Sequence, residues 1–360
     1  MKKLIISLTV VFLILLATSP DADLTAAWDP GLNINNYTEA VTTEPAVGHI
    51  VGWGDNSHSE CGAMNGRDFV AIAAGGSHNV ALRADGTLAA WGDNTCCQCS
   101  KTPVGNNFVA ISAGDRHSLA IKNDGTLTAW GDNTWGQLNT PPGYNYTAIA
   151  AGNYHNLALH SDGWLAAWGK DEYGQCRNTP AGMDFIAVAA GRWHSLALKA
   201  DGSLVSWGWD YYGQCRNTPQ GNDFVAIAAG EAHSLALRAD GTLVAWGDNT
   251  YCECEVPDGN DFVAISAGYS HSLALKSDGT LDAWGWNFHE QCNVPSSKSY
   301  NFIGIAAGGG HNIAITTQKC TTPILGDFDG DCQVDFTDFA IFCSSWLQCN
   351  LDPPEACWPR

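Results

Sequence analysis

A unit of 38 to 40 residues repeats along this chain, and this repeat constrains the fold more than any other feature of the sequence. The run Phe-Val-Ala-Ile-Ala-Ala-Gly at Phe69 returns in near copies, each followed by a histidine, and a Trp-Gly pair recurs with the same period. Such self-similarity is typical of propellers and other repeat arrays. The copies begin at Phe108, Tyr146, Phe185, Phe224, Phe262 and Phe302, the histidines are His78, His117, His155, His194, His233, His271 and His311, and the tryptophans are Trp53, Trp91, Trp130, Trp168, Trp207, Trp246 and Trp284.

The pattern inside a unit predicts short β-strands. Residues 118–122 alternate small or polar residues with Leu119 and Ile121, and Asp124-Gly125 then supplies the residues that a tight type I′ turn needs. With the Phe-Val-Ala-Ile run and a short Gly-Gln-Cys segment, each unit is expected to hold about four strands, the size of one propeller blade. No helical periodicity is visible, which excludes a helical solenoid. The Asp-Gly turn recurs at Asp85, Asp124, Asp162, Asp201, Asp240 and Asp278.

The two ends of the array are complementary halves of one unit. Residues 49–67 contain only the second half, with Trp53-Gly54, and residues 301–317 contain only the first half, with His311. Six whole units and two halves make seven, and a ring that joins the halves in one blade leaves no open sheet edge. The sequence therefore predicts an all-β fold in which residues 49–320 form a closed seven-bladed β-propeller.

The repeat resembles a known family. Ala-Gly-x-x-His-Ser-Leu-Ala-Leu, Asp-Gly-Thr-Leu and Trp-Gly-Asp-Asn-x-x-Gly-Gln are similar to the regulator of chromosome condensation repeat, which implies a seven-bladed propeller. Two features depart from the family pattern. The usual Gly-Gln-Leu is mostly Gly-Gln-Cys here, and the unit of His311 has no Asp-Gly turn.

The repeated histidines and tryptophans favour structural roles over a site. Metal chelation needs ligands about 2 Å from one ion, whereas one histidine per blade is distributed around a ring, so we expect hydrogen bonds that stabilise the blades. The Trp-Gly tryptophans are expected to pack as wedges between blades.

One repeated position holds cysteine in six units and Leu138 in the seventh. A position that accepts leucine is an apolar packing position, so we expect free thiols there rather than disulfides. Cys96, Cys97 and Cys252 fall outside this position, and their pairing stays open. The six cysteines are Cys61, Cys99, Cys176, Cys215, Cys254 and Cys292.

The residues that break the repeat lie before each histidine and after each Trp-Gly pair. Turns in solvent prefer small polar residues, so the aromatic residues concentrated here predict an adhesive surface. The repeats also resemble the plant ultraviolet-B photoreceptor, which implies that these two loop classes line one face that contacts other proteins. Tyrosine, tryptophan and arginine supply interface hot spots, although such rings also serve to cover gaps between loops. The candidate partner-binding residues are Trp135, Tyr154, Tyr173, Arg192, Trp193, Trp209, Tyr211, Tyr212, Tyr251, Tyr269 and Trp286.

The N-terminus predicts export. Lys2-Lys3, an apolar run over residues 4–16 and the small residues 17–19 have the three regions of a signal peptide. The run is shorter than the roughly 20 residues of a membrane span. We therefore expect residues 1–19 to be a signal peptide, residues 20–48 an acidic linker, and the mature protein to be secreted or in the cell envelope without spanning a membrane. The net charge of −20 repels phosphate backbones, so we expect no nucleic-acid partner.

Residues 321–360 predict a separate calcium-binding module. Oxygen-bearing side chains stand at positions 1, 3, 5, 9 and 12 of a loop that is close to the EF-hand pattern, followed by a short amphipathic helix. The segment resembles half of a dockerin module, but Cys332 replaces the usual glycine and there is no second loop. The alternative is an acidic tail stapled by disulfides among Cys332, Cys343, Cys349 and Cys357. The expected calcium ligands are Asp327, Asp329, Asp331, Gln333, Asp335 and Asp338.

Two classes of function fit these features. The first is a secreted, non-enzymatic propeller that binds a protein or a cell-surface polymer through its aromatic loops and is attached through the calcium module. The alternative is a regulator of the guanine-nucleotide-exchange type, or a component of a secreted polysaccharide-degrading assembly. No Gly-x-Ser-x-Gly, His-Glu-x-x-His or phosphate-binding Gly-Lys-Ser/Thr motif is present, so an enzymatic reading rests on analogy.

Overall fold

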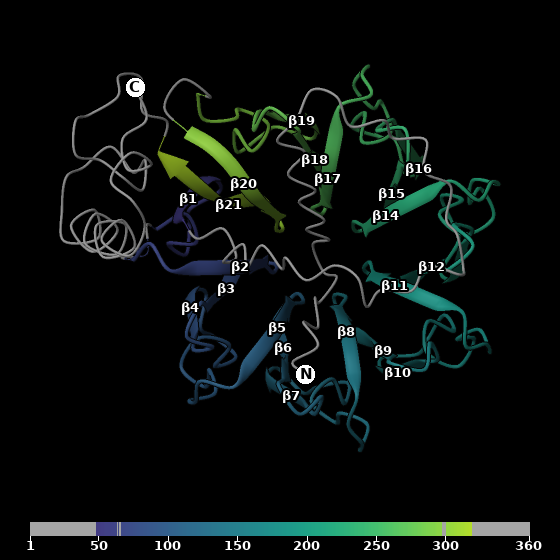
Figure 1. Ribbon diagram of the computed structural model, residues 1–360, viewed down its shortest axis with the longest axis horizontal. Helices are drawn as coiled ribbons and strands as arrows, with labels where there is room; N and C mark the ends of the chain where they lie inside the picture. The colour runs from purple at the N-terminus through teal and green to yellow at the C-terminus, as the bar shows by residue number, and fades with distance from the viewer. Residues whose placement is uncertain (1–47, 63, 65, 297–299, 319–360) are drawn as a thin grey trace, which may run out of the picture.

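The structure is a computed structural model that describes residues 48–318, with the exception of residues 63, 65 and 297–299. Over this range the chain forms twenty-one β-strands arranged as blades around a central axis (Figure 1). The inner strands are β2 (Phe69–Ala74), β5 (Phe108–Ala113), β8 (Tyr146–Ala151), β11 (Phe185–Ala190), β14 (Phe224–Ala229), β17 (Phe262–Ala267) and β20 (Tyr300–Ala307). The middle strands are β3 (His78–Arg83), β6 (His117–Lys122), β9 (His155–His160), β12 (His194–Lys199), β15 (His233–Arg238), β18 (His271–Lys276) and β21 (His311–Gln318). The outer strands are β4 (Leu88–Gly92), β7 (Leu127–Gly131), β10 (Leu165–Gly169), β13 (Leu204–Gly208), β16 (Leu243–Gly247), β19 (Leu281–Gly285) and β1 (His49–Gly54).

Seven antiparallel sheets of three strands each make up the blades, which confirms the predicted all-β architecture. Six blades use consecutive strands, and the seventh combines β1 with β20 and β21 from the other end of the described chain. In that blade Trp53 pairs with Asn312, and Gly54 pairs with His311. The two half-units therefore join in one sheet, as their sequences predict.

Each unit holds three strands rather than the expected four. The Gly-Gln-Cys segment forms turns, because its first residue has a left-handed backbone, with φ of +80° at Gly136 and +64° at Cys97. Its amides are also engaged by side chains: the N–H groups of Cys99 and Ser100 donate to Asn94 Oδ1 at 3.0 and 2.9 Å. These amides are not free to extend a ladder, so the sheet ends at the Trp-Gly strand.

The hydrophobic core lies between neighbouring blades. Leu196 and Leu198 of β12, for example, are fully buried against Phe224 and Trp246 of the next blade. Burying each such side chain stabilises the fold by about 1.5–3 kcal/mol. The inner strands present small residues such as Ala113 to the central axis, where they line a narrow cavity of about 90 Å³. No described segment forms a helix long and apolar enough to cross a bilayer.

The seven repeated histidines, called here the core histidines, join each blade to the next. Every one is buried, and its Nε2 forms a hydrogen bond with a serine or asparagine at the second position of the following middle strand. This confirms the predicted structural role, and the last bond returns from β21 to β3. The pairs are His78–Ser118 (2.8 Å), His117–Asn156 (2.6 Å), His155–Ser195 (2.9 Å), His194–Ser234 (2.9 Å), His233–Ser272 (3.0 Å), His271–Asn312 (2.7 Å) and His311–Asn79 (2.8 Å).

The repeated tryptophans also join successive units. In each, the indole N–H donates to the backbone carbonyl of the glutamine or glutamate in the preceding Gly-Gln-Cys turn, as from Trp130 to Gln98 at 2.8 Å. The closing bond runs from Trp53 to Gln291 at 3.0 Å. The indole thus fills space and satisfies a turn carbonyl, as a wedge between blades requires.

The described cysteines are free thiols, as expected for the repeated position. There the Sγ donates to the backbone carbonyl six residues earlier, as from Cys215 to Trp209 at 3.3 Å. Burial, with the nearby Asp210 carboxylate, raises the pKa of the Cys215 thiol to about 12. A thiol with so high a pKa is unreactive at neutral pH. Cys96, Cys97 and Cys252 are also free.

Candidate binding face

Two kinds of loop lie at the same end of every blade, and together they form what we call the loop face. One joins the inner strand to the middle strand, and the other follows the outer strand. In blade β11–β13 the backbone N–H of Trp209 donates to the carbonyl of Trp193 at 2.9 Å and ties the two loops together. The same bond recurs in the other blades between Asp55 and Gly310, Asp93 and Ser77, Asp132 and Arg116, Lys170 and Tyr154, Asp248 and Ala232, and Trp286 and Ser270.

Five of the predicted rings converge on this face in what we call the aromatic patch: Tyr173, Trp193, Trp209, Tyr211 and Tyr212. Trp193 and Trp209 meet edge to face with their centroids 5.0 Å apart, and Tyr173 lies 5.4 Å from Trp193. Tyr211 is nearly parallel to Trp209 at 6.0 Å, and Tyr212 meets Trp209 edge to face at 5.6 Å. These separations are those of attractive aromatic pairs. The rings come from two adjacent blades.

The cations beside the patch are neutralised within the protein. The Arg192 guanidinium lies 4.2 Å from the centroid of the Trp193 ring and forms an ion pair with Glu231. Lys170, in the loop after an outer strand, lies near two other predicted residues, 4.3 Å from the Trp135 ring and 5.5 Å from the Tyr154 ring. Lys170 Nζ is also 3.0 Å from a Glu172 carboxylate oxygen. The region therefore presents aromatic rings with little net charge.

Tyr251 and Trp286 form a second, separate group on the loop face. Their rings lie 6.3 Å apart, and Trp286 stacks on Phe288 at 6.0 Å and meets His289 edge to face at 5.2 Å. Phe288 and His289 belong to the same variable loop as Trp286, so their proximity follows from the chain itself.

Tyr269 occupies a different place from the other predicted residues. Its hydroxyl donates to Asp115 Oδ1 at 2.5 Å across the mouth of the central channel. Gly76 and Gly309 make room for it, because a Cβ on Gly76 would lie 2.7 Å from the Tyr269 hydroxyl. Burial, followed by the Asp115 carboxylate, raises the pKa of Tyr269. Tyr269 therefore ties two blades together across the channel.

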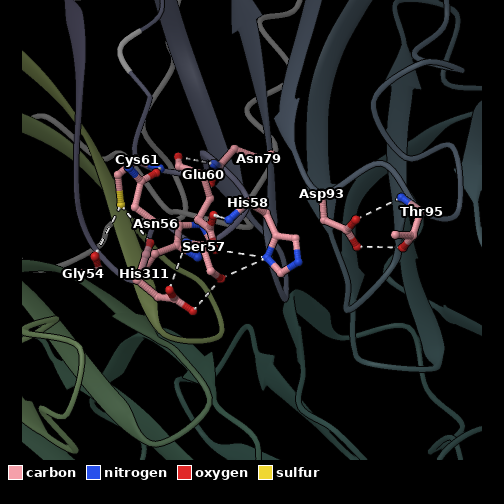
Figure 2. A network of polar contacts seen from close by, with 12 residues as sticks. Gly54, Asn56, Ser57, His58, Glu60, Cys61, Asn79, Asp93, Thr95 and His311 are labelled. Atoms are coloured by element: carbon pink, nitrogen blue, oxygen red, sulfur yellow. Dashed lines mark hydrogen bonds and ion pairs between the residues drawn. The ribbon is translucent and has the colours of Figure 1, made fainter.

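Most other blades close the loop after the outer strand with polar side chains. Figure 2 shows one such loop, in which Thr95 donates from its backbone N–H and its hydroxyl to the carboxylate of Asp93, at 2.9 and 2.8 Å. The same view includes the turn after β1, in the closing blade that joins β1 to β20 and β21, where the N–H of Cys61 donates to Asn56 Oδ1 at 2.9 Å. Polar side chains are thus sufficient to hold this loop in shape, and aromatic side chains at these positions are the exception.

The structure places six of the eleven predicted face residues in the aromatic patch or, as Arg192, beside it, and two more, Trp135 and Tyr154, around Lys170. Tyr251 and Trp286 are grouped apart, and Tyr269 lies over the channel. Lys170, Glu231 and Phe288 were not among the predicted site residues, although each stands in a variable loop position that the repeat identifies. The six expected calcium ligands lie outside the described residues, as do the expected signal peptide and the dockerin-like segment.

The strand order and the loop face define the chain as a repeat-built seven-bladed β-propeller. Six segments match the family described as the regulator of chromosome condensation (RCC1) repeat, at residues 69–98, 108–137, 146–175, 185–214, 224–251 and 262–291. The chain is therefore an RCC1-repeat β-propeller. The seventh blade lies outside these segments, because it is assembled from two half-units.

Solved structures share this fold at low sequence identity. Prp20p from Saccharomyces cerevisiae is 20% identical with a TM-score of 0.67, and the match covers 85% of this chain and 96% of Prp20p. Human WBSCR16 is 17% identical with a TM-score of 0.63, over 76% of this chain and all of that one. The ectodomain of the Arabidopsis thaliana receptor kinase ACR4 is 22% identical with a TM-score of 0.58, over 71% and 96%. A sequence search of curated proteins finds no significant match.

Proposed function

We propose that this chain is a secreted, non-enzymatic binding propeller that captures a protein or cell-surface polymer through the aromatic patch. The observation that carries the proposal is the convergence of five rings from two blades on one face, beside an arginine. Tryptophan, tyrosine and arginine dominate the energetics of interfaces. Exposed apolar surface of this kind otherwise favours aggregation.

Two solved structures of one relative, yeast Prp20, support a binding role. The structure of Prp20p was determined together with its binding properties to Gsp1p and histones, and yeast RCC1 (Prp20), 21% identical to this chain with a TM-score of 0.64, has been solved bound to Kap60. Both are interactions of a propeller-containing protein with other proteins. At these identities the likeness concerns the fold, so the partner of this chain follows from its own loops. No loop residue described above favours the exchange-factor alternative.

Replacing Trp193 and Trp209 with alanine tests the proposal. Hot-spot truncations weaken binding by about 2–4 kcal/mol each, so we expect the double variant to lose at least about 30-fold in affinity for a partner captured from the native secretome or cell surface and then purified. Tyr144→Ala is the matched control, because Tyr144 is 65% exposed but precedes an inner strand, at the opposite end of the blade from the loop face. Equal capture by the wild type and the double variant, both folded by circular dichroism, would contradict the proposal.

Attachment is a separate part of the proposal. Export rests on the N-terminal sequence, and attachment rests on calcium binding by Asp327, Asp329, Asp331, Gln333, Asp335 and Asp338 in a dockerin-like loop. A carboxylate-rich loop with this spacing would hold the ion through side-chain oxygens and order the helix that follows. Both parts stay predictions from the sequence.

A further inference from the structure

Two side chains face each other across the loop after every outer strand, at the first and third positions after the Trp-Gly pair. In four loops they form an aspartate with a serine or threonine that donates to it, at distances of 2.6 to 3.3 Å. In a fifth loop they are Lys170 and Glu172, which form an ion pair. The four polar pairs are Asp55–Ser57, Asp93–Thr95, Asp132–Thr134 and Asp248–Thr250.

In the remaining two loops, aromatic rings replace this polar pair and form what we call the ring triads. Trp209 and Tyr211 are 10° from parallel with centroids 6.0 Å apart, and Tyr212 meets Tyr211 edge to face at 4.9 Å. The second triad repeats this geometry: Trp286 and Phe288 are 8° from parallel at 6.0 Å, and His289 meets Phe288 edge to face at 5.0 Å. The two triads are two blades apart on the same loop face.

The ring triads stabilise the fold less than the polar pairs do. In two of the four polar loops the buried glutamine that follows donates from Nε2 to the aspartate, from Gln98 to Asp93 at 3.1 Å and from Gln137 to Asp132 at 3.0 Å, whereas the other two loops have Glu60 and Glu253 at that position. In the triad loops the Nε2 groups of Gln214 and Gln291 are buried without a hydrogen-bond partner among the described residues, as is that of Gln175 in the Lys170–Glu172 loop. An unsatisfied buried donor costs about 1–3 kcal/mol.

The outermost rings also gain little from packing. Tyr211 is 72% exposed and Phe288 is 78% exposed. Burial of apolar area is what makes an aromatic side chain stabilising, and these rings leave most of theirs in water. Rings that replace a stabilising polar pair and remain this exposed are available to stack on a ligand.

The geometry of the triads restricts the chemistry of that ligand. Ring centroids 4.9 to 6.0 Å apart leave no space for a cation between the rings, so the triads are not aromatic cages. The nearest cation in the first triad loop, Arg216, is 3.6 Å from an Asp210 carboxylate oxygen, so the loop offers no free charge to a polyanion. What remains is the exposed flat face of a ring. Two equal faces fit a partner that repeats one neutral, flat unit.

We propose that the two ring triads are paired subsites for a neutral polysaccharide, each stacking the C–H face of one sugar ring on Tyr211 or Phe288. This rests on the proposed function and names the class of partner for the loop face. A polymer of identical units presents the same surface at both subsites, whereas a folded protein presents different side chains at each. Engagement of two subsites by one chain raises its apparent affinity through effective concentration.

The chain itself supplies variants that test this proposal without disrupting the loop. Two loop exchanges introduce the aspartate–threonine pair of the polar loops: Trp209→Asp with Tyr211→Thr, and Trp286→Asp with Phe288→Thr. The full chain is run in native gels that contain hydroxyethylcellulose, arabinoxylan or galactomannan, and its binding to a hexasaccharide of the retarding polymer is measured by calorimetry. Tyr144→Ala and Thr95→Ala are the controls.

We expect at least one of these polymers to retard the wild type and both controls. Exchange of one loop should weaken polymer binding at least about 10-fold, because bivalency is lost. The same exchange should halve the number of hexasaccharide-binding sites. The combined exchange should abolish the binding of both the polymer and the hexasaccharide. The melting temperature should stay equal or rise, since the new aspartates give Gln214 and Gln291 a partner.

Absence of retardation by all three polymers overturns the proposal, as does retention that survives the combined exchange. A marked fall in melting temperature on either exchange overturns it too, since the rings would then serve the fold. If a purified protein partner binds the loop face and no polysaccharide does, the proposed function stands and this inference fails.

Discussion

At the scale of single residues, one buried turn position shows how the charge of a side chain affects the stability of the repeat. Five turns place glutamine there, and its Oε1 accepts the backbone N–H two residues earlier, as Gln137 does from Trp135 at 2.7 Å. Two turns place glutamate there instead, and Glu253 accepts the N–H of Tyr251 at 2.7 Å. Burial, together with the Asp248 carboxylate, raises the pKa of Glu253. The glutamine turns that carry an aspartate gain an amide hydrogen bond to it, whereas Glu253 faces a second carboxylate.

Glu253→Gln should therefore stabilise the protein by about 1 kcal/mol at pH 7, the net value of one hydrogen bond. A carboxyl with a raised pKa in the folded state binds its proton more tightly there than in the unfolded chain. Its unfavourable contribution is thus present at high pH and disappears as the pH falls through the folded pKa. Denaturant unfolding at pH 7 and pH 4.5 measures both effects, with Gln137→Glu as the reverse control. A destabilised Glu253→Gln protein would refute this reading of the turn.

At the scale of the element, the turn after each outer strand depends on one left-handed residue. Gly136, Gly174 and Gly213 hold it at φ of +80° to +84°, where glycine has no steric penalty. Cys97 and Cys252 adopt the same region at +64° and +67°. An L-residue in this conformation is strained by about 1–2 kcal/mol.

Cys97→Gly should stabilise the protein by about 0.5–1 kcal/mol, since relief of this strain exceeds the added entropy of glycine in the unfolded chain. Gly136→Cys should destabilise it by a similar amount. The two midpoints of urea unfolding, measured under reducing conditions, should move in opposite directions. Movement in the same direction would mean that the thiol, and not the backbone, decides the outcome.

At the scale of the whole molecule, the core histidines make the closed ring sensitive to acid. Burial lowers the pKa of these imidazoles, to about 3 in His78, His155, His233 and His311 and to about 4 in His194 and His271. Among the described residues their Nδ1 atoms are buried without a partner, so each neutral ring has one side-chain hydrogen bond, to the next blade. Unfolding exposes seven groups that then take up protons.

We therefore expect stability to be complete above about pH 6.5, the pKa of unfolded histidine, and to fall as the pH decreases toward 4. Each core histidine contributes up to about 1.4 kcal/mol per pH unit, because the unfolded state binds the additional proton. The free energy of unfolding measured with urea at several pH values gives this slope. His194→Gln should reduce it by one proton. A flat profile between pH 6.5 and 4.5 is incompatible with neutral buried imidazoles.

The ring could be predicted from the sequence because its determinants repeat: Trp53 and His311 each complete a series of seven, so their pairing follows from counting. The prediction of a fourth strand was wrong because the left-handed residue of the turn is glycine in only three units. In other units Cys97 or Glu290 stands there, so the sequence does not indicate a turn. Among the loops, the repeat identifies the variable positions but not the direction of their side chains. Tyr269 shows this best, because its place over the channel depends on Gly76 and Gly309 in other blades.

The closing blade also determines where the described chain enters and leaves the propeller. His49 pairs with Thr316 and Tyr300 pairs with Gln318, so the described chain enters and leaves side by side, at the end of the blade farthest from Gly54 and His311, where the loop face begins. The segments that precede His49 and follow Gln318 are therefore joined to the propeller at the end of the blade opposite the loop face. The rings of the loop face lie at the other end of the blades, away from these two attachment points.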